Sequence, residues 1–128
     1  MSKATRSLTI GQNVRVTEPT APTEFEVQAY LWNELCNAGL NVRGEVKTTF
    51  NGRAACRFDL AVFDRGELTA IVEVKKSPIK HKSQDGWRGT RQGQRYEQFG
   101  VPVCIVYGMD DALQLIKEAR AGRFPPCE

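Results

Sequence analysis

Residues 57–76 read RFDLAVFDRGELTAIVEVKK, and this stretch predicts two β-strands joined by a tight turn. The first strand carries Asp59 within an otherwise apolar run, and the second strand ends in Glu73-Val74-Lys75. An acidic residue on one strand beside a Glu-x-Lys on the next can hold a divalent cation next to a lysine, because carboxylate oxygens are hard ligands. The stretch therefore predicts two central strands that carry a candidate metal site.

The turn between these strands decides whether Asp59 and Glu73 share a face of the sheet. A two-residue loop, Arg65-Gly66, would put the two carboxylates on opposite faces, because side chains alternate along a strand. A three-residue loop, Asp64-Arg65-Gly66 with a left-handed glycine, pairs Asp59 with Ile71 and makes Glu73 a same-face diagonal neighbour. Because glycine stands at the third loop position, we expect the three-residue loop.

The strand of Asp59 is also expected to pair with the strand before it. Residues 42–50 and 54–63 flank Asn51-Gly52, a pair of residues typical of a type I′ hairpin turn. The resulting register places Gly44 opposite Asp59, where the glycine would leave room beside the acid. The same face then offers an apolar floor for a helix, and both faces of the Asp59 strand are expected to be buried.

Residues 23–38 predict the first helix, with apolar residues at helical spacing and Gly39 as its stop. Thr23 and Glu26 form a capping-box pattern. Glu26 points towards solvent, whereas Glu24 falls in the middle of the apolar stripe. A carboxylate on that side is costly unless it has a partner such as a metal. Alternatively, Glu24 interacts favourably with the helix dipole and stays solvated.

The second half of the chain predicts a helix over residues 90–99 and a buried strand over residues 101–107, parallel to the strand that ends at Lys75. A last helix is expected, capped by Asp110, with Leu113 and Ile116 on its apolar face. The expected architecture is an α/β fold with a central mixed sheet flanked by helices.

Length and composition fit one soluble domain. The 128 residues are 41% apolar and 26% charged, and they suffice for a single core. We expect this domain to span residues 23–128, preceded by an N-terminal hairpin or arm over residues 1–22. No apolar run approaches the roughly 20 residues that cross a bilayer, and no secretory signal is evident. The four cysteines are expected to be reduced and mostly buried, as in a cytoplasmic protein.

Basic residues concentrate between Lys75 and Arg95, against a single acid, Asp85. Such a block would attract a polyanion, although a solvated basic loop is the alternative. Trp87 would stack on a base or wedge a junction, or else fold back onto the core. The candidate nucleic-acid-binding residues are Lys76, Lys80, Lys82, Trp87, Arg88, Arg91 and Arg95.

Over residues 23–107 the chain resembles the PD-(D/E)XK nuclease superfamily, because the acids and the lysine fall in the right order on an α-β-β-β-α-β arrangement. Phe58 departs from the proline of the motif's name. The last pair of matches fits the Q-x-x-x-Y motif of RecB-like members. The matching residues are Glu24, Asp59, Glu73, Lys75, Gln92 and Tyr96.

The resemblance implies a restriction-endonuclease-like fold and a Mg²⁺- or Mn²⁺-dependent endodeoxyribonuclease. Asp59, Glu73, Glu24 and the backbone carbonyl of Val74 would hold the metal. Lys75 would orient the attacking water or stabilise the charge on the phosphate. The glutamine and tyrosine of the Q-x-x-x-Y motif would hold the lysine and the phosphate in place.

The resemblance also implies DNA as the partner, in a bacterial or phage-infected cell. The small size favours selectivity for branched or junction DNA, as in small Holliday-junction resolvases and related phage or mobile-element nucleases. Such proteins commonly act as homodimers, so a homodimer or a higher oligomer is expected. The alternatives are a site-specific DNA endonuclease of the same fold, a nucleic-acid-binding module without turnover, and a structural or interaction protein with solvated acids.

Overall fold

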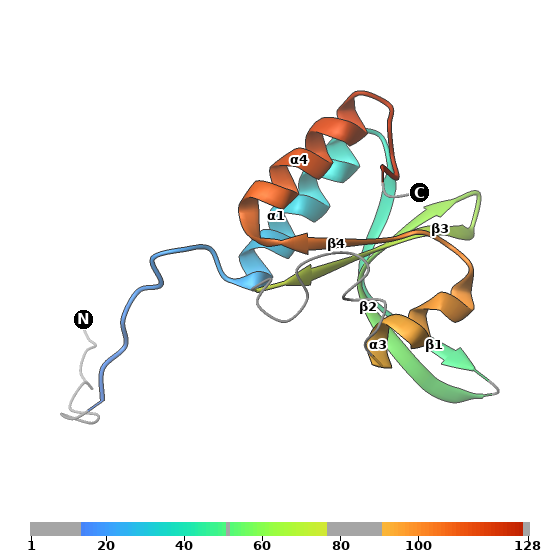
Figure 1. The fold of residues 1–128 in the computed structure, drawn as a ribbon, viewed down its shortest axis with the longest axis horizontal. Helices are drawn as coiled ribbons and strands as arrows, with labels where there is room; N and C mark the ends of the chain where they lie inside the picture. Colours follow the sequence, from blue (N-terminus) through green and yellow to red (C-terminus); the bar gives the residue numbers. More distant parts are fainter. Residues whose placement is uncertain (1–13, 51, 77–90, 127–128) are drawn as a thin grey trace, which may run out of the picture.

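Residues 14–50, 52–76 and 91–126 are described by the structure, a computed structural model. In chain order, the elements are α1 (Glu24–Asn37), β1 (Asn41–Phe50), β2 (Arg53–Asp64), β3 (Glu67–Lys75), α3 (Arg91–Tyr96), the short 3₁₀ helix η2 (Glu97–Phe99), β4 (Val103–Tyr107) and α4 (Gly108–Arg120). The strands form a sheet of order β1-β2-β3-β4, in which β3 and β4 are parallel and the other pairs antiparallel (Figure 1). The expected mixed sheet and α-β-β-β-α-β order are confirmed.

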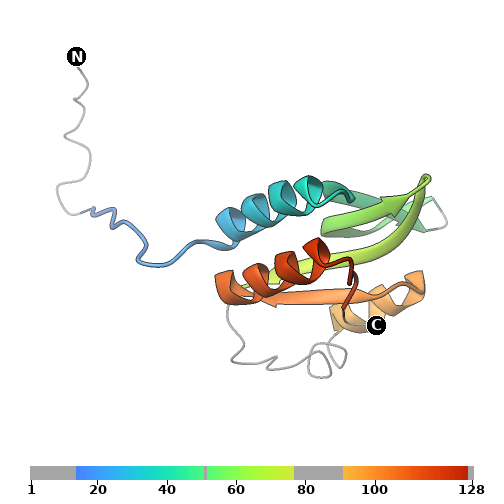
Figure 2. The ribbon, with the colours of Figure 1, turned by 90° about the horizontal axis from the view of Figure 1, so that it is seen from above.

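Helices cover both faces of this sheet. Helices α1 and α4 lie side by side on one face, and α3 lies on the other (Figure 2). Leu31 of α1 and Ile116 of α4 share one apolar core with Leu60 of β2. Tyr96 of α3 and Phe58 of β2 belong to a second core on the opposite face. Strand β2 is therefore buried on both faces, as its apolar sequence predicts.

Helix α1 begins and ends where the sequence predicts. The backbone amide of Glu26 donates to Thr23 Oγ1 at 3.2 Å, and the backbone amide of Thr23 donates to Glu26 Oε1 at 2.8 Å. This reciprocal pair is the expected capping box. Gly39, with a φ of 99°, follows the helix in the left-handed conformation that favours glycine.

The turn between β2 and β3 differs from the expected three-residue loop. It is a two-residue loop in which Arg65 and Gly66 have φ values of 53° and 83°. Two successive left-handed residues give a turn whose twist matches the flanking strands. The left-handed Gly66 is confirmed, but the predicted loop length is wrong because Arg65 is left-handed as well. The predicted pairing of Asp59 with Ile71 is also wrong, since Ile71 pairs with Ala61.

A bulge in β3 returns Glu73 to the face of the sheet that the two-residue loop alone would have turned it away from. The register shifts by one residue between Phe63 and Val62, which leaves Thr69 as an extra residue on β3. The Thr69 hydroxyl donates to the carbonyl of Val62 at 3.1 Å. The shifted register pairs Leu60 with Val72, so Asp59 and Glu73, the next residues on each strand, come together in spite of the two-residue loop.

A register shift within the β1–β2 hairpin changes the role of Gly44. Gly44 pairs with Leu60, so the predicted position opposite Asp59 is wrong. The glycine makes room for Trp32, because a Cβ at residue 44 would lie 2.7 Å from the indole ring. The Trp32 indole also donates to the carbonyl of Val42 at 2.8 Å, which ties α1 to β1.

The two ends of the chain depart from the sequence prediction. The expected N-terminal hairpin lies mostly outside the described residues, and residues 14–22 contain no strand. Helix α4 begins at Gly108, so Asp110 lies inside the first turn and the predicted cap is wrong. Ile116 is buried as predicted, but Leu113 is 47% exposed. The buried face of α4 consists of Ala112, Leu115, Ile116 and Ala119.

Two smaller expectations concern cysteines and membranes. The described cysteines are free thiols, of which Cys104 is buried, Cys56 is half-buried and Cys36 is exposed. The expectation of mostly buried thiols therefore fails for Cys36. Among the described helices, none is both long enough and apolar enough to cross a membrane.

Candidate functional site

At the point where β2 and β3 separate, the carboxylates of Asp59 and Glu73 each accept a hydrogen bond from a backbone amide of the other strand. Backbone pairing between these strands ends at Leu60 and Val72. Beyond it, the amide of Asp59 donates to Glu73 Oε2 at 2.8 Å, and the amide of Val74 donates to Asp59 Oδ2 at 2.8 Å. The carboxylates of the two acids thus bridge the strands in place of the backbone ladder.

The side-chain alternation of β2 breaks at Asp59. Phe58 packs in the core on the α3 side, whereas Leu60, two residues later, packs in the core under α1 and α4. On the neighbouring strand, Glu45 lies between the pairs Gly44–Leu60 and Val46–Phe58 and has a φ of 54°. A left-handed backbone at a residue other than glycine costs about 1–3 kcal/mol. The two strands are therefore distorted at the same level, next to the candidate metal ligand.

Glu73 is the most deeply buried acid of the site, at 2% exposure. Burial, together with the nearby charge of Asp59, raises the pKa of Glu73 to about 7. Burial also raises the pKa of Asp59, although the hydrogen bond from Val74 and the charge of Lys75 oppose this shift. The pair therefore concentrates negative charge that its surroundings do not fully neutralise.

This carboxylate pair fits a divalent cation. Mg²⁺ prefers oxygen ligands and is often held by one or two carboxylates while it keeps several water molecules. Asp59 and Glu73 supply two such carboxylates side by side, and their raised pKa values show that an added positive charge would stabilise the ionised forms. These two carboxylates could together hold such a cation, and whether one binds stays a prediction.

Lys75 lies on the same face of β3 as Glu73, two residues further along. Its Nζ donates to Gln92 Oε1 at 2.7 Å and lies 3.9 Å from Glu73 Oε1. The lysine side chain is 26% exposed, so its ammonium group can reach a ligand from solvent. The structure therefore places one positive charge against the carboxylate pair, as the sequence predicts.

Gln92 and Tyr96, one turn apart on α3, support this lysine. Gln92 Nε2 lies 3.2 Å from Tyr96 Oη and 3.4 Å from Glu73 Oε1. The Tyr96 hydroxyl donates to the carbonyl of Arg57 at 2.9 Å. Burial raises the pKa of Tyr96, so its hydroxyl keeps its proton and remains a donor. The Gln92 side chain thereby contacts the lysine, the glutamate and the tyrosine, whereas a Q-x-x-x-Y function for Gln92 and Tyr96 stays a prediction.

Two residues that contact the site were not foreseen from the sequence. Gln28 of α1 is buried, and its Nε2 donates to Glu45 Oε2 at 2.7 Å and to the carbonyl of Asp59 at 3.1 Å. Gln28 follows Val27 on the buried stripe of α1, and a polar residue at such a position is a readable signal. The left-handed conformation of Glu45 within a strand carries no comparable signal in the sequence.

The other predicted residues lie further from this pair or outside the described chain. Glu24 is exposed, and its charge contributes to the raised pKa of Asp59. Residues 14–50, 52–76 and 91–126 contain no group of three or more His, Cys, Asp or Glu able to hold a metal, so Glu24 and the carbonyl of Val74 remain predicted ligands. Lys76 and Arg95 are exposed. Outside the described residues lie Lys80, Lys82, Trp87, Arg88 and the side chain of Arg91.

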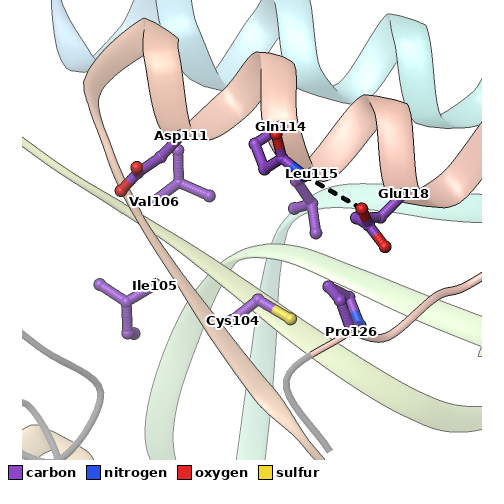
Figure 3. Close-up of a pocket in the computed structure, with 8 residues that line it drawn as sticks. All are labelled: Cys104, Ile105, Val106, Asp111, Gln114, Leu115, Glu118 and Pro126. Carbon is purple, nitrogen blue, oxygen red and sulfur yellow. Dashed lines mark hydrogen bonds between the residues drawn. The ribbon is translucent and has the colours of Figure 1, made fainter.

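Of two hollows on the described surface, one adjoins the candidate site and the other does not. A hollow of about 670 Å³ between the segment before α1 and the end of β3 is lined in part by Glu24, Phe25 and Lys76. Another, of about 350 Å³, lies between β4 and α4, where Gln114 Nε2 donates to Glu118 Oε2 at 3.0 Å (Figure 3). The first adjoins the candidate site through Lys76, whereas the second contains none of the predicted site residues.

Among known proteins, one solved domain is similar to this chain. No family model matches the chain, and no curated protein matches its sequence. A solved structure described as a VRR_NUC domain is 28% identical, and the match covers 73% of this chain and 94% of that one with a TM-score of 0.47. A TM-score this low transfers neither a fold nor an activity, so the fold and the site rest on the chain's own residues.

Proposed function

We propose that the protein is a metal-dependent endodeoxyribonuclease that hydrolyses phosphodiester bonds. The observation that carries this proposal is the meeting of Asp59, Glu73 and Lys75 where β2 and β3 separate. Two carboxylates and one ammonium group supply what phosphodiester hydrolysis needs: a place for a divalent cation and a positive charge for the phosphate.

Each residue of the site has a role in this proposal. Asp59 and Glu73 would hold Mg²⁺ or Mn²⁺, with the Val74 carbonyl and, directly or through water, Glu24 as further ligands. The ion would polarise the phosphate and lower the pKa of a bound water. Lys75 donates to the phosphate oxygens or orients the attacking water, and Gln92 fixes its ammonium group.

Basic residues would bind the DNA backbone around this centre. Lys76 and Arg95 are exposed and available for phosphate contacts. The remaining predicted contacts come from Lys80, Lys82, Arg88 and Arg91, with Trp87 stacking on a base. Binding through several lysines and arginines would weaken steeply as the salt concentration rises.

The preferred substrate in this proposal is branched or junction DNA, cut by a homodimer. This part rests on the resemblance of residues 23–107 to junction-cutting members of the PD-(D/E)XK superfamily. A site-specific endonuclease of the same fold is the second candidate. The third candidate is a nucleic-acid-binding module without turnover. The proximity of Asp59, Glu73 and Lys75 argues against this candidate.

The test is a cleavage assay with Mg²⁺ and labelled four-way junction, linear duplex and single-stranded DNA. Wild type is compared with Asp59→Asn and Lys75→Ala, and with Asp64→Asn, an exposed acid of the same strand, as a matched control. We expect wild type and Asp64→Asn to cut, with the junction preferred, and the two site variants to bind without cutting. Cleavage that survives in both site variants would overturn the site assignment. Tight binding with no cleavage by wild type would favour the non-catalytic module.

A further inference from the structure

Glu45 has an unexpected backbone conformation for its place in the fold. In the described part of the chain, Glu45 and Arg65 are the residues other than glycine with a positive φ. Arg65 occupies a two-residue hairpin loop, where a left-handed residue is required. Glu45 lies within β1, between two regular cross-strand pairs, so no turn accounts for its conformation. Such a conformation persists only where the surroundings hold it in place.

The Glu45 side chain is held by contacts that lead to the candidate site. Gln28 Nε2 donates to Glu45 Oε2 at 2.7 Å, and Arg57 Nε lies 3.2 Å from Glu45 Oε1. The same Gln28 nitrogen donates to the carbonyl of Asp59 at 3.1 Å. The backbone carbonyl of Arg57 in turn accepts a hydrogen bond from the Tyr96 hydroxyl. A chain of polar contacts therefore runs from α1 on one face of the sheet to α3 on the other, around Asp59.

The distortion of β1 at Glu45 lies at the same level as a distortion of β2 at Asp59. The distortion of β2 is the one that brings the amide and carboxylate of Asp59 to β3. On β2 the alternation breaks at Asp59, between Phe58 and Leu60, and the backbone ladder with β3 ends there. Because of this break, the Asp59 amide donates to the Glu73 carboxylate, and the Asp59 carboxylate accepts from the amide of Val74. A regular β1 strand would pair with a regular β2 strand and would remove the break.

We propose that Glu45 and Gln28 are positioning residues, which hold β2 in the broken alternation that presents Asp59 to Glu73. The Glu45 carboxylate orients the Gln28 amide, and that amide fixes the Asp59 carbonyl. The strained backbone of Glu45 is retained because its carboxylate is needed at this position. The effect on hydrolysis rests on the proposed function, whereas the effect on the Asp59–Glu73 pair does not.

The test separates strain from positioning with three variants. Glu45→Gly relieves the left-handed strain and removes the carboxylate, so we expect an unchanged or higher Tm together with a loss of about 10–100-fold in Mn²⁺ affinity and kcat. Glu45→Gln keeps an oxygen that accepts from Gln28 and should retain most of both. Arg65→Gly relieves the same strain in the hairpin loop, so its Tm should be unchanged or higher. Its Mn²⁺ affinity and kcat should equal those of wild type.

A readout that does not depend on activity is hydrogen exchange of the Asp59 and Val74 amides in metal-free protein. In Glu45→Gly these two amides should exchange faster while amides of the α1 and α4 core do not. Wild-type exchange at both amides, or wild-type Mn²⁺ affinity and kcat in Glu45→Gly, would overturn the proposal. If wild type cuts no DNA, the proposed nuclease fails, but the exchange and Mn²⁺ measurements still decide whether Glu45 positions Asp59.

Discussion

Asp59 and Glu73 are linked by two hydrogen bonds, in each of which the carboxylate of one acid accepts a backbone amide of the other acid's strand. The Asp59 amide donates to the Glu73 carboxylate, and the amide that follows Glu73, that of Val74, donates to the Asp59 carboxylate, each at 2.8 Å. Moving either acid therefore disturbs the other. This coupling explains how two carboxyl groups stay together in a largely buried place, and it makes their geometry sensitive to the register of β2 and β3.

The first prediction concerns the stability of the metal-free protein as a function of pH. The Glu73 carboxyl has a pKa of about 7 in the folded protein, above the ordinary value of 4.5. The folded state therefore binds more protons than the unfolded state between these values, and the free energy of unfolding falls as the pH rises through this window. The raised pKa of Asp59 acts in the same direction.

Thermal melts in EDTA at several pH values between about 5 and about 8 measure this effect. We expect the Tm of wild type to fall across this range and that of Glu73→Gln to change much less. Glu67→Gln, an exposed glutamate of the same strand, serves as the control and should follow wild type. Curves for wild type and Glu73→Gln that run parallel would show that Glu73 does not titrate in this range. Added Mg²⁺ should raise the Tm of wild type most at the high end.

The sequence predicted much of the fold because its signals are local. Thr23 and Glu26 determine the start of α1 by a capping box, and Gly39 ends it. The apolar runs of β2 and β4 predict buried strands. The structure also brings Asp59, Glu73 and Lys75 together as the spacing of the motif predicts, and their catalytic roles stay a prediction.

Register could not be read in the same way. The loop length was wrong, yet Asp59 still meets Glu73, because the bulge at Thr69 compensates for a loop one residue shorter. A bulge depends on packing between strands, and no single residue type in the sequence predicts it. The same holds for Glu45, whose left-handed backbone is stabilised by Gln28 from a distant helix. The sequence thus predicted that Asp59 and Glu73 meet, but through a loop length and a strand register that the structure contradicts.

The second prediction concerns Lys75. Lys75→Ala should lower kcat by about 10²–10³-fold with a small change in KM, because a charge that stabilises the developing phosphate charge acts mainly in the transition state. Lys117→Ala, which removes an exposed lysine of α4, should leave both constants unchanged. Steady-state cleavage of the preferred DNA measures both constants. A pure rise in KM for Lys75→Ala would assign the lysine to DNA binding.

The third prediction separates the two glutamates in the first turn of α1. Glu26 accepts the Thr23 amide, and a glutamine can make the same bond, so Glu26→Gln should keep both Tm and cleavage. Glu24 is exposed and its charge acts on Asp59, so Glu24→Gln should lower cleavage at low Mg²⁺ and be partly restored at high Mg²⁺. Cleavage against Mg²⁺ concentration measures the difference. Equal curves for wild type and Glu24→Gln would remove Glu24 from the metal site.

The last prediction tests the route by which the acids meet, by deleting Thr69. In the observed register, Thr69 is the extra residue of a bulge, so its deletion leaves Val62 paired with Ala70 and Leu60 paired with Val72, next to Asp59 and Glu73. The deletion variant should therefore fold and retain most of the Mn²⁺ affinity. In a three-residue loop without a bulge, the same deletion would turn Glu73 to the other face of the sheet and abolish Mn²⁺ binding. Mn²⁺ titration of a deletion variant that still melts cooperatively distinguishes the two registers. A bulge residue can be deleted without moving Glu73 relative to Asp59, whereas deleting a residue from a regular strand turns Glu73 to the other face.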